Sequence, residues 1–257
     1  MGKVDYSRLA DSYGTSRPDY SVTVLRALLG CVRSGTDDFV AADVGAGTGI
    51  WTRMVAEQGV SCLAIEPNAA MRSKGIEWCR SSDVRWVAGS AEETGLESHS
   101  VDWVTMASSF HWARTEPALR EFSRILRKGR CLTILWNPRE LADGSIHKDV
   151  ELMIGAMVPG LKRVSSGSNS SGRDYESELR STGDFGDVIF MEARHDVRMS
   201  RERYMQAWRS VYDIQEQAGP DVFAEILQRI GRMVAPMEFI DCGYRTRAWT
   251  ATKLRDE

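Results

Sequence analysis

The chain has 257 residues, a formal net charge of −3 at pH 7 and a 42% share of hydrophobic residues. This length allows one domain with an elaborate insertion, and the composition is typical of a soluble globular protein. The arginines are scattered and there is no lysine run, so the basic patch of a nucleic-acid binder is missing. No apolar stretch reaches transmembrane length or has signal-peptide character. We therefore expect no nucleic-acid partner, no membrane partner and a cytoplasmic location.

The cysteines argue against a disulfide framework and against a metal centre. They are odd in number, widely spaced and without a C-x-x-C pair, and they lie at Cys31, Cys62, Cys79, Cys131 and Cys242. A zinc knuckle or a disulfide-rich scaffold needs closely spaced pairs. We expect reduced thiols and no bound metal.

The first half of the chain predicts an N-terminal helical flap followed by a doubly wound sheet. Residues 1–30 have helical patterns, including "VTVLRALLG", which ends at Gly30, and we assign residues 1–35 to the flap. From about residue 39 to residue 136, helix-patterned segments alternate with strand-length apolar runs: "FVAADV", "SCLAIE", "VRWVA", "VDWVTMA" and "CLTILW". This alternation is typical of an α/β fold with a parallel sheet. We assign residues 36–136 to its core.

A helix is predicted before the fifth of these runs. Leu119, Phe122, Ile125 and Leu126 recur at helical spacing, Pro117 suits a first helical turn, and Gly129 suits a helix end. The apolar stripe should pack on the sheet.

The second half, residues 137–257, predicts cap helices and the last strands of the same single domain. Residues 137–163 are predicted to be helical, and "GDVIFMEARHDVRM" predicts a strand. Helical patterns over 200–218 and 220–235 precede a final strand-like segment, "MEFIDCGYRTRAWTATK". The late helices should therefore lie inside the last connection of the sheet.

The segment "DVGAGTG", residues 43–49, follows the first strand and opens a helix, as nucleotide-binding loops do. A dinucleotide fingerprint needs its third glycine at position 50, which is Ile50, and no Gly-Lys-Ser/Thr follows for a phosphate loop. Asp43 in the turn suits a cationic ligand better than a pyrophosphate, because a carboxylate repels phosphate. A plain strand-to-helix turn of another α/β protein remains the alternative.

Asp43-x-Gly45-x-Gly47-x-Gly49 resembles the first motif of class I S-adenosylmethionine-dependent methyltransferases. Glu66 ends the second strand about 20 residues later, where a carboxylate can accept the ribose hydroxyls of an adenosine. It would serve NAD equally well. Pro67 and Met71 just beyond it are placed to touch the adenine, although Met71 also suits the core.

The third strand ends in "VAGSAEET", which resembles the Gly-Asp-Ala-Glu motif of that family with Ser90 in place of the aspartate. A serine hydroxyl can still accept from the adenine amine. "VDWVTMASSFHWA" and "EFSRILRKGRCLTILWN" extend the resemblance, which covers roughly residues 5–136 and is strongest to the methyltransferase type 11 group, including proteins similar to trans-aconitate methyltransferase.

The resemblance implies a Rossmann-like, mostly parallel seven-stranded sheet that binds S-adenosyl-L-methionine and releases S-adenosyl-L-homocysteine. The opening "LADSYGTSRPDY" resembles the segment that closes over the cofactor in that group. The residues that it assigns to the cofactor are Tyr13, Arg17, Asp43, Gly45, Ala46, Gly47, Glu66, Pro67, Met71, Ser90, Ala91, Glu92, Ala107 and Ser108.

His111 follows the fourth strand at the edge where the methyl group should be presented, so it is the candidate general base. It could instead only shape the pocket. Tyr204, Trp208 and Tyr212 recur at one helical face and are assigned to the acceptor site, although such a stripe also suits a core. Trp112 and Arg139 are assigned there too, and Arg139 could clamp an acidic acceptor.

The predicted function is methyl transfer to a small-molecule acceptor, and the predicted acceptor atom is a carboxylate or hydroxyl oxygen. An alternative is transfer to oxygen or carbon of a carrier-bound or quinone-type acceptor. From a different class, the chain could be an NAD-binding oxidoreductase or a non-catalytic cofactor-binding protein. We expect a monomer or a homodimer.

Overall fold

The computed structural model describes residues 16–33, 38–163 and 173–254. Tyr13 lies outside the described residues. The described strands are β1 (Val40–Val44), β2 (Ser61–Ile65), β3 (Val84–Val87), β4 (Val101–Ala107), β5 (Leu126–Trp136), β6 (Phe185–Ser200) and β7 (Phe239–Lys253). The helices are α2 (Val22–Val32), α3 (Ile50–Ala56), α4 (Ala69–Trp78), α5 (Thr115–Ile125), α6 (Ile146–Met157), α7 (Tyr175–Arg180), α8 (Arg201–Arg209) and α9 (Tyr212–Val234), with a 3₁₀ turn, η2, at Phe110–Trp112.

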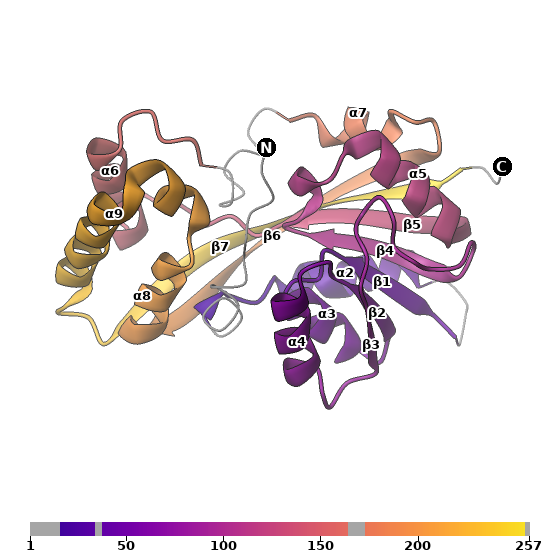
Figure 1. Cartoon of the computed structure of the whole chain (residues 1–257), viewed down its shortest axis with the longest axis horizontal. Helices are drawn as coiled ribbons and strands as arrows, with labels where there is room; N and C mark the ends of the chain where they lie inside the picture. The colour runs from indigo at the N-terminus through magenta and orange to yellow at the C-terminus, as the bar shows by residue number, and fades with distance from the viewer. Residues whose placement is uncertain (1–15, 34–37, 164–172, 255–257) are drawn as a thin grey trace.

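The strands form one 7-stranded sheet in the order β3-β2-β1-β4-β5-β7-β6 (Figure 1). β1 to β5 are parallel, whereas β7 is antiparallel to both β5 and β6. The predicted α/β, mostly parallel seven-stranded fold is therefore confirmed. The chain leaves β1 toward β2 on one side and later returns to β4 on the other. Ligands of such sheets bind at the carboxyl ends of the strands on either side of this switch point.

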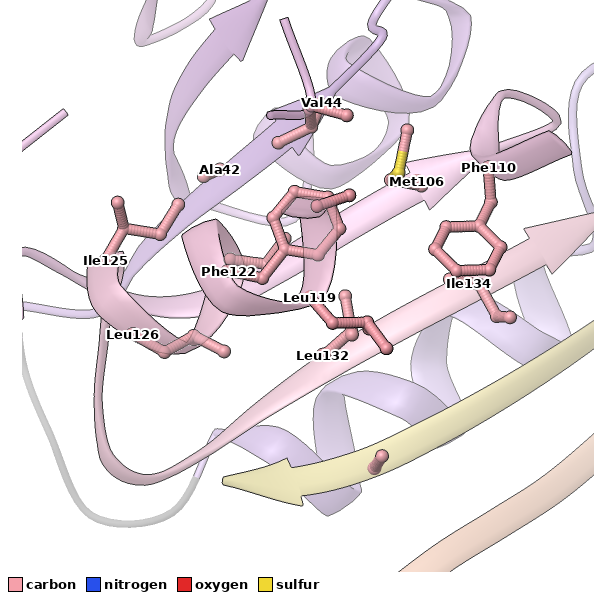
Figure 2. Packing of buried hydrophobic residues seen from close by; sticks show 14 of the residues in the cluster. Ala42, Val44, Met106, Phe110, Leu119, Phe122, Ile125, Leu126, Leu132 and Ile134 are labelled. Carbon is pink, nitrogen blue, oxygen red and sulfur yellow. The ribbon is translucent and has the colours of Figure 1, made fainter. Parts of the chain in front are cut away.

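One face of the sheet is covered by α5, whose apolar stripe was predicted. Leu119, Phe122 and Ile125 are fully buried in one cluster with side chains of β1, β4 and β5 (Figure 2). Residues that recur at i, i+3 and i+6 or i+7 share one helix face, which explains why the pattern was readable. α7 joins the same cluster through Tyr175 and Leu179.

The opposite face is covered by α2 and α3. Leu25 and Leu28 of α2 and Trp51 of α3 pack in one buried cluster with Trp103 of β4. Trp103 also donates through Nε1 to Thr133 Oγ1 at 2.8 Å, and Thr133 Oγ1 lies 2.9 Å from Thr250 Oγ1. These hydrogen bonds satisfy polar atoms inside the core and link β4, β5 and β7 side by side.

β6 and β7 are longer than the strands beside them. β5 pairs with β7 only from Cys131↔Thr252 to Trp136↔Arg247, whereas β6 and β7 continue to Ser200↔Phe239. Because β7 runs against β5, this projecting ribbon extends beyond the carboxyl edge of the parallel strands. α6, α8 and α9 gather on it as a separate cap (Figure 1), with its own apolar core. The predicted location of the late helices in the last connection is correct.

Several predicted element boundaries were wrong, and the helix predicted over 137–163 is confined to Ile146–Met157. Residues 17–21 are not helical, because Pro18 disfavours helix in its predecessor and Ser21 caps α2, which runs on to Val32. α5 ends at Ile125, before the predicted stop at Gly129.

The predicted helix over 200–218 is in fact two helices, α8 and the start of α9, separated at Ser210 and Val211. Tyr212 therefore begins a new helix and does not continue the face of Tyr204 and Trp208. The predicted boundary near residue 219 is a kink inside α9, where Gly219 has φ 73° and Pro220 follows.

None of the helices in the described ranges combines the length and the apolar character that a membrane crossing requires.

Gly75 of α4 allows the helix to approach Trp86 of β3. A Cβ added at Gly75 would lie 2.0 Å from the Trp86 ring, and one added at Gly49 would lie 3.1 Å from the same ring. We expect Gly75→Ala to lower the free energy of unfolding by about 1 to 3 kcal/mol, the usual cost of overpacking. Chemical denaturation followed by circular dichroism measures it.

Gly155→Ala in α6 is the matched control, because nothing lies within 4 Å of its added Cβ. There, replacing a helix-interior glycine should stabilise the protein by roughly 0.5 to 1 kcal/mol. Equal effects of the two substitutions would contradict the close approach of α4 to β3.

Candidate functional site

The alternate glycines of the loop after β1 share one backbone requirement. Gly45, Gly47 and Gly49 have φ +69°, +59° and +84°, a left-handed conformation that other residues rarely adopt. A Cβ at Gly45 would also lie 2.8 Å from the Ser109 side chain, whereas at Gly47 it would find only Met71 Cε, at 3.8 Å. The loop is therefore closed on the Gly45 side and accessible at Gly47.

The amides of this loop are already hydrogen-bonded to the end of β2. Gly45 and Ala46 donate to the Ile65 carbonyl at 2.8 and 3.1 Å, and Gly47 donates to Glu66 Oε2 at 2.8 Å. A phosphate site needs free amides and no carboxylate beside them. The loop is thus poorly suited to a pyrophosphate, which argues against NAD.

Glu66 is 8% exposed and is held at both oxygens, because Oε1 accepts from the Asn68 amide at 2.8 Å. Burial raises the pKa of Glu66, and the hydrogen bonds from Asn68 and Gly47 oppose the rise. Each carboxylate oxygen keeps a further lone pair for a ligand hydroxyl. Met71 is buried beside Gly47, while Pro67 is exposed.

Asp43 lies below the loop, buried between neighbouring elements. Its Oδ2 accepts from Thr52 Oγ1 at 2.6 Å and its Oδ1 from Thr105 Oγ1 at 3.0 Å. Burial raises the pKa of Asp43 to about 7; the two threonine hydrogen bonds oppose this rise and the charge of Glu66 adds to it. Asp43 and Glu66 together make this part of the site acidic, which favours a cationic ligand.

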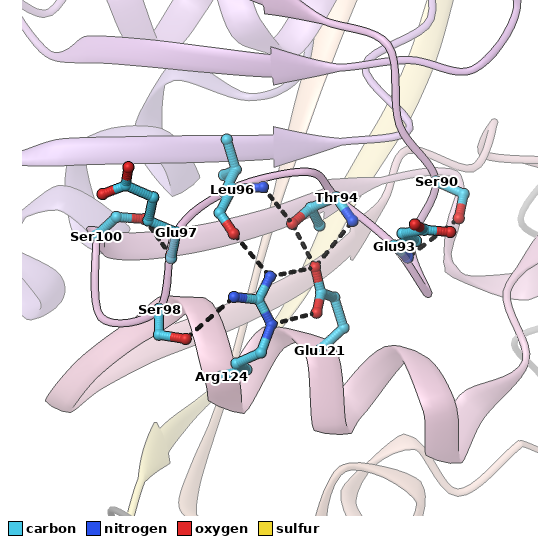
Figure 3. A network of polar contacts seen from close by, with 9 residues as sticks. All are labelled: Ser90, Glu93, Thr94, Leu96, Glu97, Ser98, Ser100, Glu121 and Arg124. Carbon is cyan, nitrogen blue, oxygen red and sulfur yellow. Dashed lines mark hydrogen bonds and ion pairs between the residues drawn. The ribbon is translucent and has the colours of Figure 1, made fainter.

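The loop between β3 and β4 is tied to α5 by a polar network (Figure 3). Glu121 Oε1 accepts from the amide and hydroxyl of Thr94 at 2.8 and 2.5 Å. Arg124 binds both oxygens of Glu121 and donates to the Leu96 carbonyl at 2.7 Å and to Ser98 Oγ at 3.1 Å. A helix buried on the sheet thereby fixes the loop that carries the predicted adenine residues.

Ser90, Ala91 and Glu92 lie in the turn of this loop. Ser90 donates through its amide to the Glu93 carbonyl at 2.9 Å and accepts from the Glu93 amide through Oγ at 3.2 Å. Glu92 Oε1 accepts from the amide of Arg114 at 2.8 Å. Glu92 thus joins the turn to the segment after η2, and its role toward a cofactor stays a prediction.

Ser108, after Ala107 at the end of β4, has a strained backbone. Its φ of 53° is left-handed, and its amide donates to the Leu135 carbonyl at 2.8 Å. Tyr20 donates to Ser108 Oγ at 2.9 Å. Such strain persists where surrounding contacts determine it, frequently at functional sites. Sequence reasoning missed Tyr20, although it lies in the N-terminal segment already singled out.

Arg17 lies where the core meets the cap. Its Nη2 donates to the Ser210 carbonyl at 3.1 Å, and Arg203 Nη2 donates to the Arg17 carbonyl at 2.9 Å. Tyr20 packs edge-on against Trp51, with ring centroids 5.3 Å apart. The segment from Arg17 to Tyr20 therefore connects both parts beside the β4 end. Its closure over a cofactor stays a prediction.

His111 lies in η2, beside the β4 end. Both of its ring nitrogens are buried without a hydrogen-bond partner, and its ring is 4.7 Å from that of Trp112, which is 44% exposed. Burial lowers the pKa of His111 to about 4, with Arg173 adding to the effect and Asp213 opposing it. The imidazole is therefore neutral near pH 7, able to accept a hydrogen bond and weak as a base.

Tyr204 and Trp208 belong to the apolar core of the cap, where each is 1% exposed. Tyr204 Oη lies 3.0 Å from His147 Nδ1. Arg139 is only partly buried, and its guanidinium lies 4.3 Å from the centroid of the Trp208 ring. Tyr212 is partly buried at the start of α9. The structure therefore brings Arg139, Tyr204 and Trp208 together and separates Tyr212 from them.

Within residues 16–33, 38–163 and 173–254, no cluster of three His, Cys, Asp or Glu side chains could hold a metal ion.

The family model described as "Methyltransferase domain" matches residues 42–134, from β1 to β5. The chain carries a class I methyltransferase domain. The prediction of this family is confirmed, while a specific likeness to trans-aconitate methyltransferase stays a prediction. The methyltransferase domain contains the glycine loop, Glu66, Ser90 and His111, but not Arg139 or the cap.

An uncharacterized methyltransferase of Mycobacterium tuberculosis is 31% identical over 139 residues, which are 53% of this chain and 54% of that protein. The chain thus spans about half the length of this curated relative. A structure named as a type II methyltransferase from Anaeromyxobacter dehalogenans matches with a TM-score of 0.66 at 20% identity, covering 93% of this chain and 99% of that one.

Phosphoethanolamine N-methyltransferase 2 of Haemonchus contortus, solved with S-adenosyl-L-methionine, matches with a TM-score of 0.56 at 14% identity, over 99% of this chain and 61% of that one. At such identities the two matches show only that this chain shares its fold with these two structures.

The raised pKa of Asp43 gives a pH-dependent stability. Between about pH 4 and pH 7 the folded chain keeps a proton on Asp43 that the unfolded chain has lost, so its contribution to stability falls as pH rises. Asp43→Asn should abolish this contribution. Denaturation of both proteins from pH 5 to pH 8 should therefore show the wild type losing stability relative to the variant as pH rises.

The exposed Asp149 of α6, replaced by Asn, serves as the control and should give no such trend. A pH-independent difference between wild type and Asp43→Asn would contradict the shifted pKa.

Proposed function

We propose that the chain binds S-adenosyl-L-methionine at the carboxyl edge of β1, β2 and β4 and transfers its methyl group to an oxygen of a small-molecule acceptor. The observation that carries the proposal is the glycine loop whose amides are held by β2, with two buried carboxylates in place of a phosphate cradle. The methyltransferase domain and the S-adenosyl-L-methionine bound in the Haemonchus structure support it.

In this proposal Glu66 accepts the ribose hydroxyls through its remaining lone pairs, and Asp43 stabilises the cationic amino-acid end. Gly47 and Met71 border the nucleoside, and the turn at Ser90 and Ala91 receives the adenine. The other residues assigned to the cofactor are Tyr13, Arg17, Gly45, Ala46, Pro67, Glu92, Ala107 and Ser108.

The bound cofactor supplies an electrophilic methyl group on a sulfonium. Transfer is an in-line displacement, so the chain contributes alignment of the acceptor and exclusion of water. A carboxylate acceptor needs no base, and a hydroxyl gains from one. The neutral His111 can accept a hydrogen bond from the acceptor, with Trp112 beside it. We propose Arg139, Tyr204, Trp208 and Tyr212 as the acceptor side of the site.

Experiments can test three alternatives. The acceptor could be carrier-bound or of quinone type, the chain could be an NAD-binding oxidoreductase, or it could be a non-catalytic cofactor-binding protein. Titration calorimetry with S-adenosylhomocysteine and with NADH separates an NAD-binding protein from the proposal, whereas a non-catalytic cofactor-binding protein is recognised by the absence of methyl transfer. Heat with NADH and none with S-adenosylhomocysteine would reject the proposal. A screen with methyl-labelled cofactor against small acids, phenols and amines then identifies the acceptor. We further propose a cytoplasmic monomer or homodimer.

Replacing either acidic residue by alanine should weaken the cofactor site. We expect Asp43→Ala and Glu66→Ala each to weaken the binding of S-adenosylhomocysteine. The binding free energy should become less favourable by roughly 1 to 3 kcal/mol, the scale of hydrogen bonds to charged groups. Calorimetry measures it, and unchanged affinity in both variants would contradict the assignment of the loop.

His111→Ala should spare the cofactor, because no hydrogen bond joins its ring nitrogens to the glycine loop within the described part of the chain. We expect an unchanged affinity for S-adenosylhomocysteine and about tenfold lower kcat/KM with an identified acceptor, the scale of one lost hydrogen bond. His111→Gln, which keeps polar atoms in the pocket, should retain more activity. Loss of cofactor binding with the fold intact would place His111 in the cofactor pocket instead.

A further inference from the structure

The backbone around Arg139 is fixed, although it follows the end of β5. The Glu140 amide donates to the Gly243 carbonyl at 2.8 Å, and the Arg245 amide donates to the Pro138 carbonyl at 2.9 Å. Arg139 itself is paired with Tyr244 in an isolated antiparallel bridge. This segment therefore extends the sheet along the projecting part of β7. The backbone of Arg139 is held in place at the junction of core and cap.

The Arg139 side chain is held between aromatic groups. Its guanidinium stacks on Trp208 at 4.3 Å, and its Nε donates to Tyr244 Oη at 3.4 Å. Trp208 and Tyr244 are 1% and 3% exposed, whereas Arg139 is only partly buried. The plane of the guanidinium is therefore set by two core side chains, and the residue as a whole keeps some solvent exposure.

No carboxylate neutralises Arg139 within the described part of the chain. Glu151, whose charge acts on Arg139, is bound to Arg163 at 2.5 Å, and Asp213 is bound to the same arginine at 3.2 Å. Glu151 is thus engaged by Arg163, and Glu140 next to Arg139 in the chain is engaged by Arg194 and Arg245. A poorly solvated cation without a paired carboxylate is costly, and a ligand anion would relieve this cost.

The same side-chain cluster holds a buried imidazole. Among the residues that the structure describes, His147 Nε2 is buried with no hydrogen bond, although His147 Nδ1 lies 3.0 Å from Tyr204 Oη. Burial lowers the pKa of His147 to about 4, with Arg139 adding to the effect. His147 is neutral near pH 7, so the cluster around Arg139 has the charge of one guanidinium.

We infer that the acceptor carries a carboxylate that binds the guanidinium of Arg139, which orients the acceptor at the carboxyl edge of the sheet. The inference rests on the proposed function and names its substrate class. A planar guanidinium fixed on an aromatic ring matches the two oxygens of a carboxylate, which a lysine ammonium cannot do. One positive charge also matches a monoanionic group better than a phosphate dianion.

The test uses the full chain saturated with S-adenosylhomocysteine and pairs of small probes: succinate, glutarate, benzoate and phenylacetate, each against its own amide. Dissociation constants come from ligand-observed NMR titrations. For at least one pair, we expect the wild type to bind the carboxylate at least tenfold more tightly than the amide. Arg139→Gln should lose this preference, while its affinity for S-adenosylhomocysteine stays within twofold of wild type.

Two further variants separate charge recognition from loss of structure. Arg139→Lys keeps the charge without the planar fork and should retain an intermediate preference. Arg229→Gln replaces an exposed arginine of α9 that pairs with Glu225, and should bind like wild type. A wild type that binds S-adenosylhomocysteine but prefers no carboxylate, or an Arg139→Gln variant that keeps the preference, overturns this inference alone. A wild type that does not bind S-adenosylhomocysteine contradicts the proposed function, and the inference with it.

Discussion

The hydrogen bond from the Gly47 amide to the Glu66 carboxylate determines what the edge of the sheet can bind. It joins the loop after β1 to the end of β2, and it requires the left-handed backbone that only glycine adopts without strain at positions 45, 47 and 49. It also places a negative charge where a pyrophosphate would need free amides. Two features that are separate in the sequence are therefore one structural unit.

Around this unit the site is built from elements fixed by burial elsewhere. α5 is anchored on the sheet by Leu119 and Phe122, and through Glu121 it holds the loop after β3 in place. At the β4 end, the hydrogen bond from Tyr20 to Ser108 maintains a strained residue beside the glycine loop. The geometry of the site thus depends on packing that lies largely outside it.

Much of the core could be predicted because its signals are local. The glycine spacing follows from backbone conformation at three nearby residues, and the α5 stripe follows from the period of one helix. The break at Ser210 and Val211 could not be found this way, because Tyr204, Trp208 and Tyr212 have the spacing of one continuous helix. Burial in the cap, which depends on α6 and β7, made Tyr204 and Trp208 core residues.

Contacts between distant parts of the chain could also not be predicted from the sequence. No sequence pattern near Arg139 predicts that Trp208 stacks on it. None predicts that Arg163 binds Glu151 and Asp213. Tyr20 lies close to Arg17 in the chain, yet its partner Ser108 is on another element. The aromatic and charged residues were visible in the sequence, but their pairing depends on the topology that brings β4, β7 and the cap together.

The β6–β7 ribbon, which is paired continuously from Ile189↔Thr250 to Ser200↔Phe239, joins the sheet rigidly to the cap. A cap joined through loops alone could swing as a lid, but here any displacement would have to bend two hydrogen-bonded strands together. The wall that contains Trp208 is consequently in place before a ligand arrives, so the entropy of ordering it is lost during folding and not during binding. Such preorganisation favours selectivity for acceptor shape over tolerance of many shapes.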